Sequence, residues 1–389
     1  MVSTATKPAQ TLLPEAEPAA LGIDPERLER LYGLIEQQIA EGRYPGAQIA
    51  LARYGKLAAC RSFGRARLEP NAEPANASTT WLLMSQTKVI TAATIWVLVE
   101  RGLLRFADRI AEHVPEFSRN GKGEITLFQL LTHQAGFPGA VVSEDAWTDH
   151  ELLRRSVCDF TLEWTPGAKI QYHGASAHWT AAVLIEAITG RDFREVIRSE
   201  LLDPLGLADI FVGVPEAEQA RCADFHAVQD GRMAPAPGRN TAAFRAAGVP
   251  GGGGFATAAA YAAFYQMMLA GGTLNGVRVL SPRMIEFVTR NHTGDRLDEN
   301  MGMPMHRGLG PHVRGFTPTI RGLGAIASPS TYGHGGAGSS YSWADPESGV
   351  SFTYLSNAMC EEPWHTQRLD RISTIAHSTI VDQGVGRRT

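Results

Sequence analysis

A serine and a lysine three residues apart are the side chains with the clearest chemical potential. Ser85 and Lys88 lie in residues 81–104, an apolar stretch whose pattern predicts a buried helix that ends at Gly102. Residues three apart share a helix face, so the hydroxyl and the amine are expected to lie side by side. Burial lowers the pKa of a lysine and turns its amine into a proton acceptor. Such an amine can activate a serine as a nucleophile toward acyl groups.

The Ser-x-x-Lys spacing is weak evidence on its own, since Ser85 could cap the helix and Lys88 could extend to solvent. Lysine is scarce in this chain, however, which makes a lysine on an apolar helix unusual. The five lysines are Lys7, Lys56, Lys88, Lys122 and Lys169. The start of the helix also offers free backbone N–H groups, where a developing oxyanion can be stabilised.

Two further segments supply groups that a reactive serine needs. Tyr172 follows a turn-rich stretch, and a phenol beside a cationic lysine can take a proton from serine and return it to a leaving group. Residues 332–338, Tyr-Gly-His-Gly-Gly-Ala-Gly, precede a predicted hairpin, and their glycines let a strand edge approach a substrate closely. The N–H groups of Ser85 and Ala337 are predicted to form the oxyanion hole.

Other motif interpretations fail on their context. Gly333, Gly335 and Gly338 have the spacing of a dinucleotide-binding fingerprint, but a predicted hairpin follows them in place of a helix. The chain contains no Gly-x-Ser-x-Gly and no His-Glu-x-x-His sequence. Its twelve histidines lack metal-ligand spacing, and His133 and His173 are interpreted as hydrogen-bonded structural groups.

Composition is that of an ordinary globular protein. The chain has 389 residues, of which 44% are hydrophobic and 20% charged, enough for a large core. A net charge of -4 without a basic block argues against nucleic acid or a membrane surface as a partner. Residues 1–20 have no apolar core and predict a flexible arm, so the expected location is the cytoplasm. Cys60, Cys158, Cys222 and Cys360 are far apart in the sequence and are expected to be reduced thiols.

Periodicity along the chain predicts an α+β fold. Helices are expected at residues 25–42, 127–134, 150–158, 175–189, 257–271 and 364–381, and hairpins at residues 47–64 and 340–355. Strands near both ends with helices between them predict an antiparallel sheet flanked by helices, with an inserted all-helical lobe. The domains are expected to be residues 21–80 with 240–389, and residues 81–239.

Two irregular stretches are predicted to set specificity. Residues 209–250 and 291–329 show little periodicity, and long irregular segments in a compact enzyme commonly wall a pocket. Four aromatic residues are candidates for the pocket lining or, equally, for packing: Phe137, Trp147, Trp164 and Tyr341.

Together these segments resemble the serine β-lactamase-like superfamily, which includes class C β-lactamases, DD-peptidases and family VIII carboxylesterases. The resemblance covers residues 46–355. Residues 130–136, Leu-Leu-Thr-His-Gln-Ala-Gly, are similar to the family's Leu-Leu-Thr-His-x-Ser-Gly segment. Trp-Thr-Pro-Gly at residues 164–167, Pro-Leu-Gly-Leu at 204–207 and the glycines at 251–254 are similar in kind and order.

By position, the resemblance implies that Ser85 is the nucleophile, Lys88 its proton-accepting partner and Tyr172 the general base or relay. His334, Gly335 and Gly336 would take the place of the family's Lys-Thr-Gly strand and bind the substrate. The resemblance also implies a site between the sheet and the helical lobe, with no metal or organic cofactor.

Two departures from the family pattern favour uncharged esters as substrates. Tyr-x-Asn has become Tyr172-His173-Gly174, which loses the amide that holds a peptide-like or lactam carbonyl. The lysine of Lys-Thr-Gly has become His334, a weaker and pH-dependent cation for a substrate carboxylate. The predicted function is a serine carboxylesterase that acts on short-chain or small uncharged esters through an acyl-enzyme. An amide, β-lactam or D-peptide hydrolase, an acyltransferase, and a non-catalytic acyl-binding sensor remain alternatives.

Overall fold

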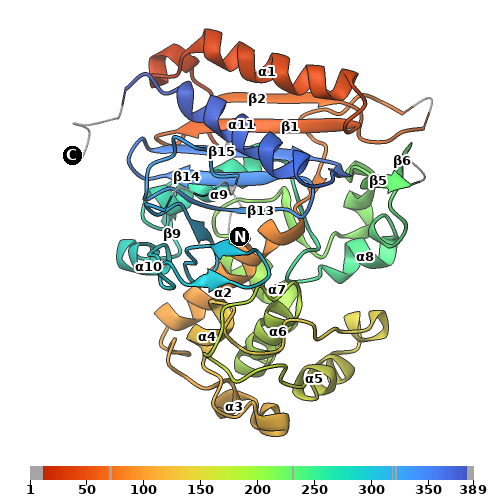
Figure 1. Ribbon diagram of the computed structural model, residues 1–389, viewed down its shortest axis with the longest axis vertical. Coiled ribbons are helices and arrows are strands. Elements are labelled where there is room, and N and C mark those ends of the chain that lie inside the picture. Colours follow the sequence, from red (N-terminus) through yellow and green to blue (C-terminus); the bar gives the residue numbers. More distant parts are fainter. Residues whose placement is uncertain (1–11, 70–71, 230–231, 318, 320–321, 383–389) are drawn as a thin grey trace, which may run out of the picture.

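A six-stranded antiparallel sheet forms the centre of the molecule (Figure 1). In the computed structural model, which describes residues 12–69, 72–229, 232–317, 319 and 322–382, its strand order is β12-β13-β14-β15-β1-β2. The strands are β1 (Gly46–Arg53), β2 (Lys56–Gly64), β12 (His312–Val313), β13 (Tyr332–Gly335), β14 (Tyr341–Asp345) and β15 (Val350–Ser356). β1 pairs with both β2 and β15, so the sheet joins segments from both ends of the chain. This confirms the predicted α+β class with an antiparallel sheet.

Helices cover both faces of this sheet. α1 (Pro25–Ala40) and α11 (Trp364–Ser378) pack on one face, and α9 (Ala258–Leu269) packs on the other. Alternation along β1 serves both layers, because Ile49 and Leu51 join the core under α1 and α11 while Ala50 and Ala52 join the core under α9. α1 begins where the sequence predicts, since the Asp24 side chain accepts hydrogen bonds from the N–H groups of Glu26 and Arg27.

A helical lobe lies between β2 and the later strands in the sequence, and Figure 1 places it beneath the sheet. Its helices are α2 (Thr87–Glu100), α3 (Ile110–His113), α4 (Leu127–Leu131), α5 (His150–Cys158), α6 (Ser176–Thr189) and α7 (Phe193–Ile197). α2 is buried on nearly every side, as its apolar sequence predicts. The predicted start of this helix is wrong, because Trp81–Leu82 is strand β3 and Ser85 lies in the 3-10 turn Met84–Gln86 before Thr87.

Short elements fill the stretches that the sequence left irregular. β3, β4 (Ile210–Val212) and β7 (Gly254–Ala256) form a small sheet, and β16 (Ala358–Met359), β5 (His226–Gln229) and β6 (Arg232–Pro235) form another. The remaining elements are α8 (Ala242–Ala247), β8 (Thr273–Leu274), β9 (Val277–Arg278), α10 (Pro282–Val288), β10 (Leu297–Asp298) and β11 (Met303–Pro304).

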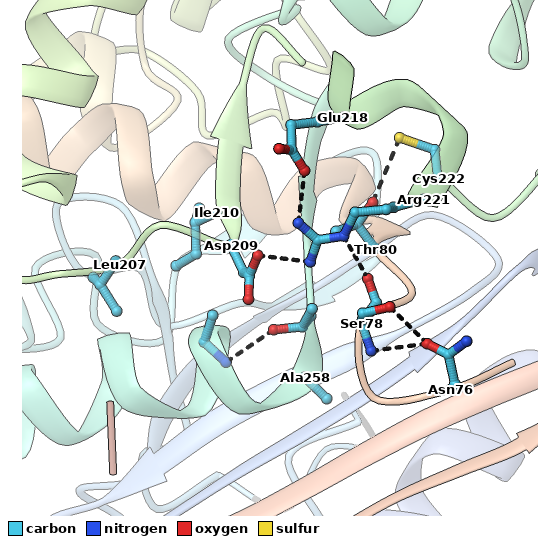
Figure 2. A network of polar contacts seen from close by, with 12 residues as sticks. Asn76, Ser78, Thr80, Leu207, Asp209, Ile210, Glu218, Arg221, Cys222 and Ala258 are labelled. Atoms are coloured by element: carbon cyan, nitrogen blue, oxygen red, sulfur yellow. Dashed lines mark hydrogen bonds and ion pairs between the residues drawn. The ribbon is translucent and has the colours of Figure 1, made fainter. Parts of the chain in front are cut away.

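Arg221 ties the chain ahead of Ser85 to the small sheet (Figure 2). Its Nη2 lies 2.6 Å from Asp209 Oδ1, its Nη1 lies 2.6 Å from Glu218 Oε2, and its Nε donates to the Ser78 carbonyl at 2.9 Å. The Thr80 N–H donates to the Arg221 carbonyl at 3.0 Å. Because Thr80 directly precedes β3, this network fixes the strand that leads into the Ser85 turn.

The predicted flexible arm differs from what the structure shows over residues 12–20. Leu13 is only 4% exposed, and the Ala16 N–H donates to the Leu57 carbonyl at 3.0 Å, so this part packs against β2. Residues 1–11 of the predicted arm lie outside the described residues. None of the helices in the described part of the chain has the length and apolarity needed to cross a bilayer.

Candidate active site

The turn that carries Ser85 is held in an unusual backbone conformation. Met84, directly before the serine, has a φ of 49°, a left-handed conformation that costs a non-glycine residue about 1–3 kcal/mol. Buried hydrogen bonds hold the turn. The Thr87 hydroxyl donates to the Met84 carbonyl at 2.7 Å, and the Tyr261 hydroxyl donates to the Gln86 carbonyl at 2.8 Å. This conformation places Ser85 at the wall of a cavity, ahead of the first turn of α2.

Lys88 is fully buried, and its amine lies beside the Ser85 hydroxyl. Lys88 Nζ is 3.3 Å from Ser85 Oγ, 2.6 Å from the Gly174 carbonyl and 2.5 Å from the Gly251 carbonyl. Burial lowers the pKa of Lys88; interaction with Tyr172 opposes this shift and the positive charge of Arg307 adds to it. A neutral amine has two N–H donors and one lone pair. The two carbonyls take both donors, which leaves the lone pair for the serine proton.

Lys122 shows what a buried lysine looks like without such chemistry. It is also fully buried, and its Nζ donates to the carbonyls of Arg119, Cys158 and Phe160 at 2.9, 2.8 and 2.5 Å. Three carbonyls match the three N–H groups of an ammonium, so every donor is used. Lys88 differs because a hydroxyl replaces the third carbonyl.

Tyr172 lies between the helical lobe and the loop after β10. Its ring centroid is 5.0 Å from Lys88 Nζ and 4.8 Å from the centre of the His133 ring. The sequence places a histidine next to it, and His173 is fully buried with both ring nitrogens engaged. His173 Nδ1 donates to the Gln171 carbonyl at 2.7 Å, and Nε2 accepts from the Phe137 N–H at 3.2 Å. His173 thus holds the backbone around Tyr172 and has no free nitrogen for a substrate.

The predicted oxyanion groups come together at the end of β13. A methyl group added at Gly336 would lie 2.8 Å from the Leu83 carbonyl oxygen and 3.1 Å from Met84 Cβ, so the two backbones are in close contact. Within the described chain, the N–H groups of Ser85 and Ala337 have no acceptor among the turn and loop hydrogen bonds. Two free N–H groups on adjoining segments at the cavity wall are the arrangement that an oxyanion hole needs.

Gly336→Ala is expected to lower kcat about a hundredfold, because the added methyl group pushes Ala337 away from Ser85 and misplaces one oxyanion donor. Steady-state ester hydrolysis measures this loss. Gly33→Ala is the matched control, since nothing lies within 4 Å of a methyl group there, and it should leave kcat unchanged. A Gly336→Ala enzyme with wild-type kcat would contradict the assignment of Ala337.

The cavity beside Ser85 has a volume of about 360 Å³. Its wall combines the serine, the tyrosine, the end of β13 and the methionine-rich loop, which carries Met301, Met303 and Met305. The lining residues are Ser85, Tyr172, Met301, Met303, Met305, His312, Gly322, His334, Gly335, Gly336, Ala337, Gly338, Tyr341, Glu362, His365, Thr366 and Leu369. None of them is lysine or arginine, and Glu362 is the one carboxylate among these described residues. An anionic substrate group therefore meets no cation in this wall.

His334 is a neutral group at this position. Burial, with the charges of Lys88 and Arg307, lowers the pKa of His334 to about 3. Its Nδ1 donates to the Gly335 carbonyl at 2.8 Å, and within the described chain Nε2 has no hydrogen-bond partner. The imidazole thus offers a lone pair at Nε2. The sequence interpretation of His334 as a weak cation needs correction, because an acceptor does not hold a carboxylate.

The structure corrects one further expectation about the pocket and decides between two alternatives in a second. The described residues of 209–250 contribute nothing to the cavity wall, whereas residues 291–329 contribute five residues, among them three methionines. Of the four candidate aromatic residues, Tyr341 lines the cavity and Phe137, Trp147 and Trp164 do not. In the described ranges, no cluster of three or more His, Cys, Asp or Glu side chains is arranged to hold a metal ion.

Sequence reasoning missed a buried charged pair beside Tyr172, formed by Asp298 and Arg307. It also missed the two carbonyls that orient Lys88. The glycines at 251–254 did give a signal for one of them, because Gly251 can approach Gly174 closely: a methyl group there would lie 3.3 Å from the Gly174 oxygen. No periodicity marks Asp298 or Arg307.

Comparison with known proteins places this geometry in one family. The family model described as beta-lactamase matches residues 31–374. The chain is 30% identical over 317 residues to the esterase/beta-lactamase LipL of Mycobacterium tuberculosis, covering 74% of this chain and 71% of that protein. Among solved structures, it is similar to a penicillin-binding protein homolog from Caulobacter crescentus and to a family VIII carboxylesterase.

Both structural similarities extend over nearly the whole chain. The Caulobacter protein has a TM-score of 0.80 and 26% identity, covering 92% of this chain and 99% of that one. The carboxylesterase has a TM-score of 0.77 and 26% identity, covering 90% and 98%. The matched segment contains Ser85, Lys88, Tyr172 and residues 334–337, which the fold gathers around one cavity. The chain therefore belongs to the beta-lactamase family, and it is a hydrolase with that family's serine-enzyme fold.

Proposed function

We propose that the chain is a serine carboxylesterase that hydrolyses uncharged esters through an acyl-enzyme. The observation that carries this proposal is the neutral, buried His334 in a cavity wall that contains no lysine or arginine. A penicillin or a D-alanyl peptide presents a carboxylate, and nothing in this wall neutralises it. An ester with an apolar acyl or alkoxy group suits the methionine side of the cavity, since methionine adapts its shape to irregular apolar groups.

The proposed reaction begins at the Ser85 hydroxyl. Ser85 Oγ attacks the ester carbonyl while its proton passes to the Lys88 and Tyr172 pair. The carbonyl oxygen becomes an oxyanion, which the N–H groups of Ser85 and Ala337 stabilise. The C–O bond to the alcohol then breaks, the alcohol leaves with a proton from Tyr172, and the acyl group remains on Ser85.

Water completes the cycle in a second step of the same kind. The Lys88 and Tyr172 pair takes a proton from water, the hydroxide adds to the acyl carbonyl, and the bond to Ser85 Oγ breaks. The acid is released and the serine regains its proton. The similarity to LipL, whose name includes esterase, and to a family VIII carboxylesterase supports this choice of substrate.

The absence of the family's asparagine amide also supports an ester as the substrate. The position of the family's asparagine is Gly174, which has no side chain and whose carbonyl accepts from Lys88 at 2.6 Å. His173, beside it, turns both ring nitrogens to the backbone. A peptide or lactam amide therefore loses the partner that the family pattern provides.

A substrate panel tests the proposal. Purified protein is assayed with p-nitrophenyl acetate, butyrate and octanoate, with nitrocefin and with a D-alanyl-D-alanine peptide. Because their carboxylates find no partner, nitrocefin and the peptide are expected to have kcat/KM values at least about ten to a hundred times lower than those of the esters. Intact mass under turnover should show a butyryl adduct on the protein. Faster cleavage of nitrocefin or the peptide would replace the esterase assignment with an amide or lactam hydrolase, and a stable adduct without turnover would indicate an acyl-binding sensor.

A further inference from the structure

A buried ion pair lies directly beside Tyr172, outside the cavity wall. Arg307 Nη2 contacts Asp298 Oδ2, and the side chains of both residues are at most 1% exposed. Asp298 closes β10, and Arg307 follows β11 in the methionine-rich loop. Neither residue is in the lining of the cavity, so any effect of the pair on a substrate must pass through other residues.

The pair contacts Tyr172 through both of its members. Asp298 Oδ1 accepts a hydrogen bond from the Tyr172 N–H at 3.3 Å, and the Arg307 guanidinium carbon lies 5.1 Å from the centre of the Tyr172 ring. Asp298 Oδ1 also accepts from the N–H groups of Asn300 and Met301, at 3.1 and 3.3 Å. The same carboxylate thus fixes the tyrosine backbone and the turn that brings Met301 to the cavity.

Arg307 also contacts the histidine pair at the cavity. Its Nη1 lies 3.2 Å from His312 Nε2, and the His312 ring packs at a tilt of 30° against that of His334, with centres 4.2 Å apart. Charges buried in this way give little net stability, because desolvation offsets most of their attraction, and apolar residues of similar size often serve as well. Stability alone therefore gives little reason for a guanidinium at this position.

The Lys88 amine and the Arg307 guanidinium carbon lie 5.0 and 5.1 Å from the centre of the same Tyr172 ring, so the positive charge of Arg307 acts on the amine. It adds to the effect of burial in lowering the pKa of Lys88, which Tyr172 opposes. Among the described residues, the other titratable groups around the amine are four histidines, and burial lowers the pKa of each: His133, His173, His178 and His334. All four are neutral at pH 7, so the local charge balance depends on Lys88, Tyr172 and the Arg307–Asp298 pair.

We infer that Arg307, held by Asp298, is a positioning residue for the Ser85, Lys88 and Tyr172 group. From beside the tyrosine ring, its positive charge favours the uncharged form of the Lys88 amine. This inference rests on the proposed function, in which Lys88 must be uncharged to accept the serine proton. Because His334 is neutral, Arg307 would supply the permanent positive charge beside the site.

The pH profile of kcat/KM tests the inference. In the wild-type enzyme, activity is expected to rise with pH as Lys88 loses its proton. Asp298→Asn/Arg307→Gln removes both charges and keeps a hydrogen-bonded pair of similar shape. Its rising limb is expected to move up by about one pH unit, with activity recovered at higher pH. Asp298→Asn alone keeps the guanidinium and should not move the limb up, and Arg307→Lys should keep it at the wild-type position.

Controls separate charge from structural damage. Arg245→Gln breaks another largely buried pair, whose Nη2–Oδ1 distance to Asp224 is 2.7 Å, away from the cavity wall, and should leave the limb in place. If the amide pair does not fold, Asp298→Asn/Arg307→Met removes the same charges, keeps the oxygen that accepts from the Tyr172 N–H and gives the same readout. A limb at the wild-type pH in the neutral pair, or an equal upward shift in Asp298→Asn, would overturn the inference. Absence of Ser85-dependent hydrolysis in the wild type would instead overturn the proposed function.

Discussion

Ser85→Ala is expected to lower kcat for p-nitrophenyl butyrate on the order of a thousandfold or more, because the acyl-enzyme cannot form without the hydroxyl. The fold should survive, since the change removes one oxygen atom at a cavity wall. Steady-state kinetics and labelling with a fluorophosphonate probe measure the loss. Both the turnover and the label should disappear together.

Ser351→Ala provides the matched control for this loss. Ser351 is a fully buried serine on β15 whose hydroxyl donates to the Ala262 carbonyl at 3.0 Å, outside the cavity. Its replacement should leave kcat and labelling at wild-type levels. Retained labelling in Ser85→Ala would show that another nucleophile carries the reaction, and the proposed mechanism would be wrong.

Lys88→Met is expected to lower kcat by roughly a hundredfold to ten-thousandfold, because the serine loses its proton acceptor while the space remains filled. The pH profile should change as well. The rising limb belongs to the amine, whose pKa burial lowers below the usual value for lysine, so the limb should be lost in this variant. Residual turnover that keeps the wild-type limb would assign the titration to another group.

Lys122→Met separates the reaction from the general effect of removing a buried amine. This change leaves three carbonyls without a donor and is expected to destabilise the fold by about 1–3 kcal/mol. Its kcat should stay at the wild-type value, because Lys122 lies in the helical lobe outside the cavity wall. Urea unfolding should show a loss of stability in both lysine variants, whereas the ester assay should show a loss of kcat in Lys88→Met alone.

Local sequence signals were sufficient for much of the fold. Asp24 and Pro25 mark the start of α1, and the turn at Tyr54 and Gly55 joins β1 to β2 as predicted. The start of α2 was misplaced because its sequence is apolar on every face, so periodicity gives no boundary. The break comes from the left-handed backbone of Met84, which depends on hydrogen bonds from Thr87 and Tyr261.

Only part of the candidate site could be predicted from the sequence, and the reason is physical. Ser85 and Lys88 are only three residues apart, so the short turn before α2 and the first residues of α2 keep them close. The wall opposite them is built by tertiary contacts. Asp298 pairs with Arg307 across a short hairpin and reaches Tyr172 from a distant part of the chain, and no local pattern encodes such a contact. For the same reason, the sequence predicts that residues 291–329, which include the methionine-rich loop, wall the pocket. It does not predict which of their side chains face the substrate.

The pairing of β1 with β15 has a consequence for the newly made protein. Ala47 pairs with Ser356, and the whole helical lobe is synthesised between them. Contacts between such distant residues form slowly, since a long loop must close first. A ribosome-bound chain displays the Ser85 hydroxyl and the Lys88 amine well before β13 emerges from the exit tunnel. Hydrolysis is therefore expected to begin only after the carboxyl-terminal strands have been released from the ribosome. Until then, Ser85 lacks the β13 side of its site and is expected to stay inactive.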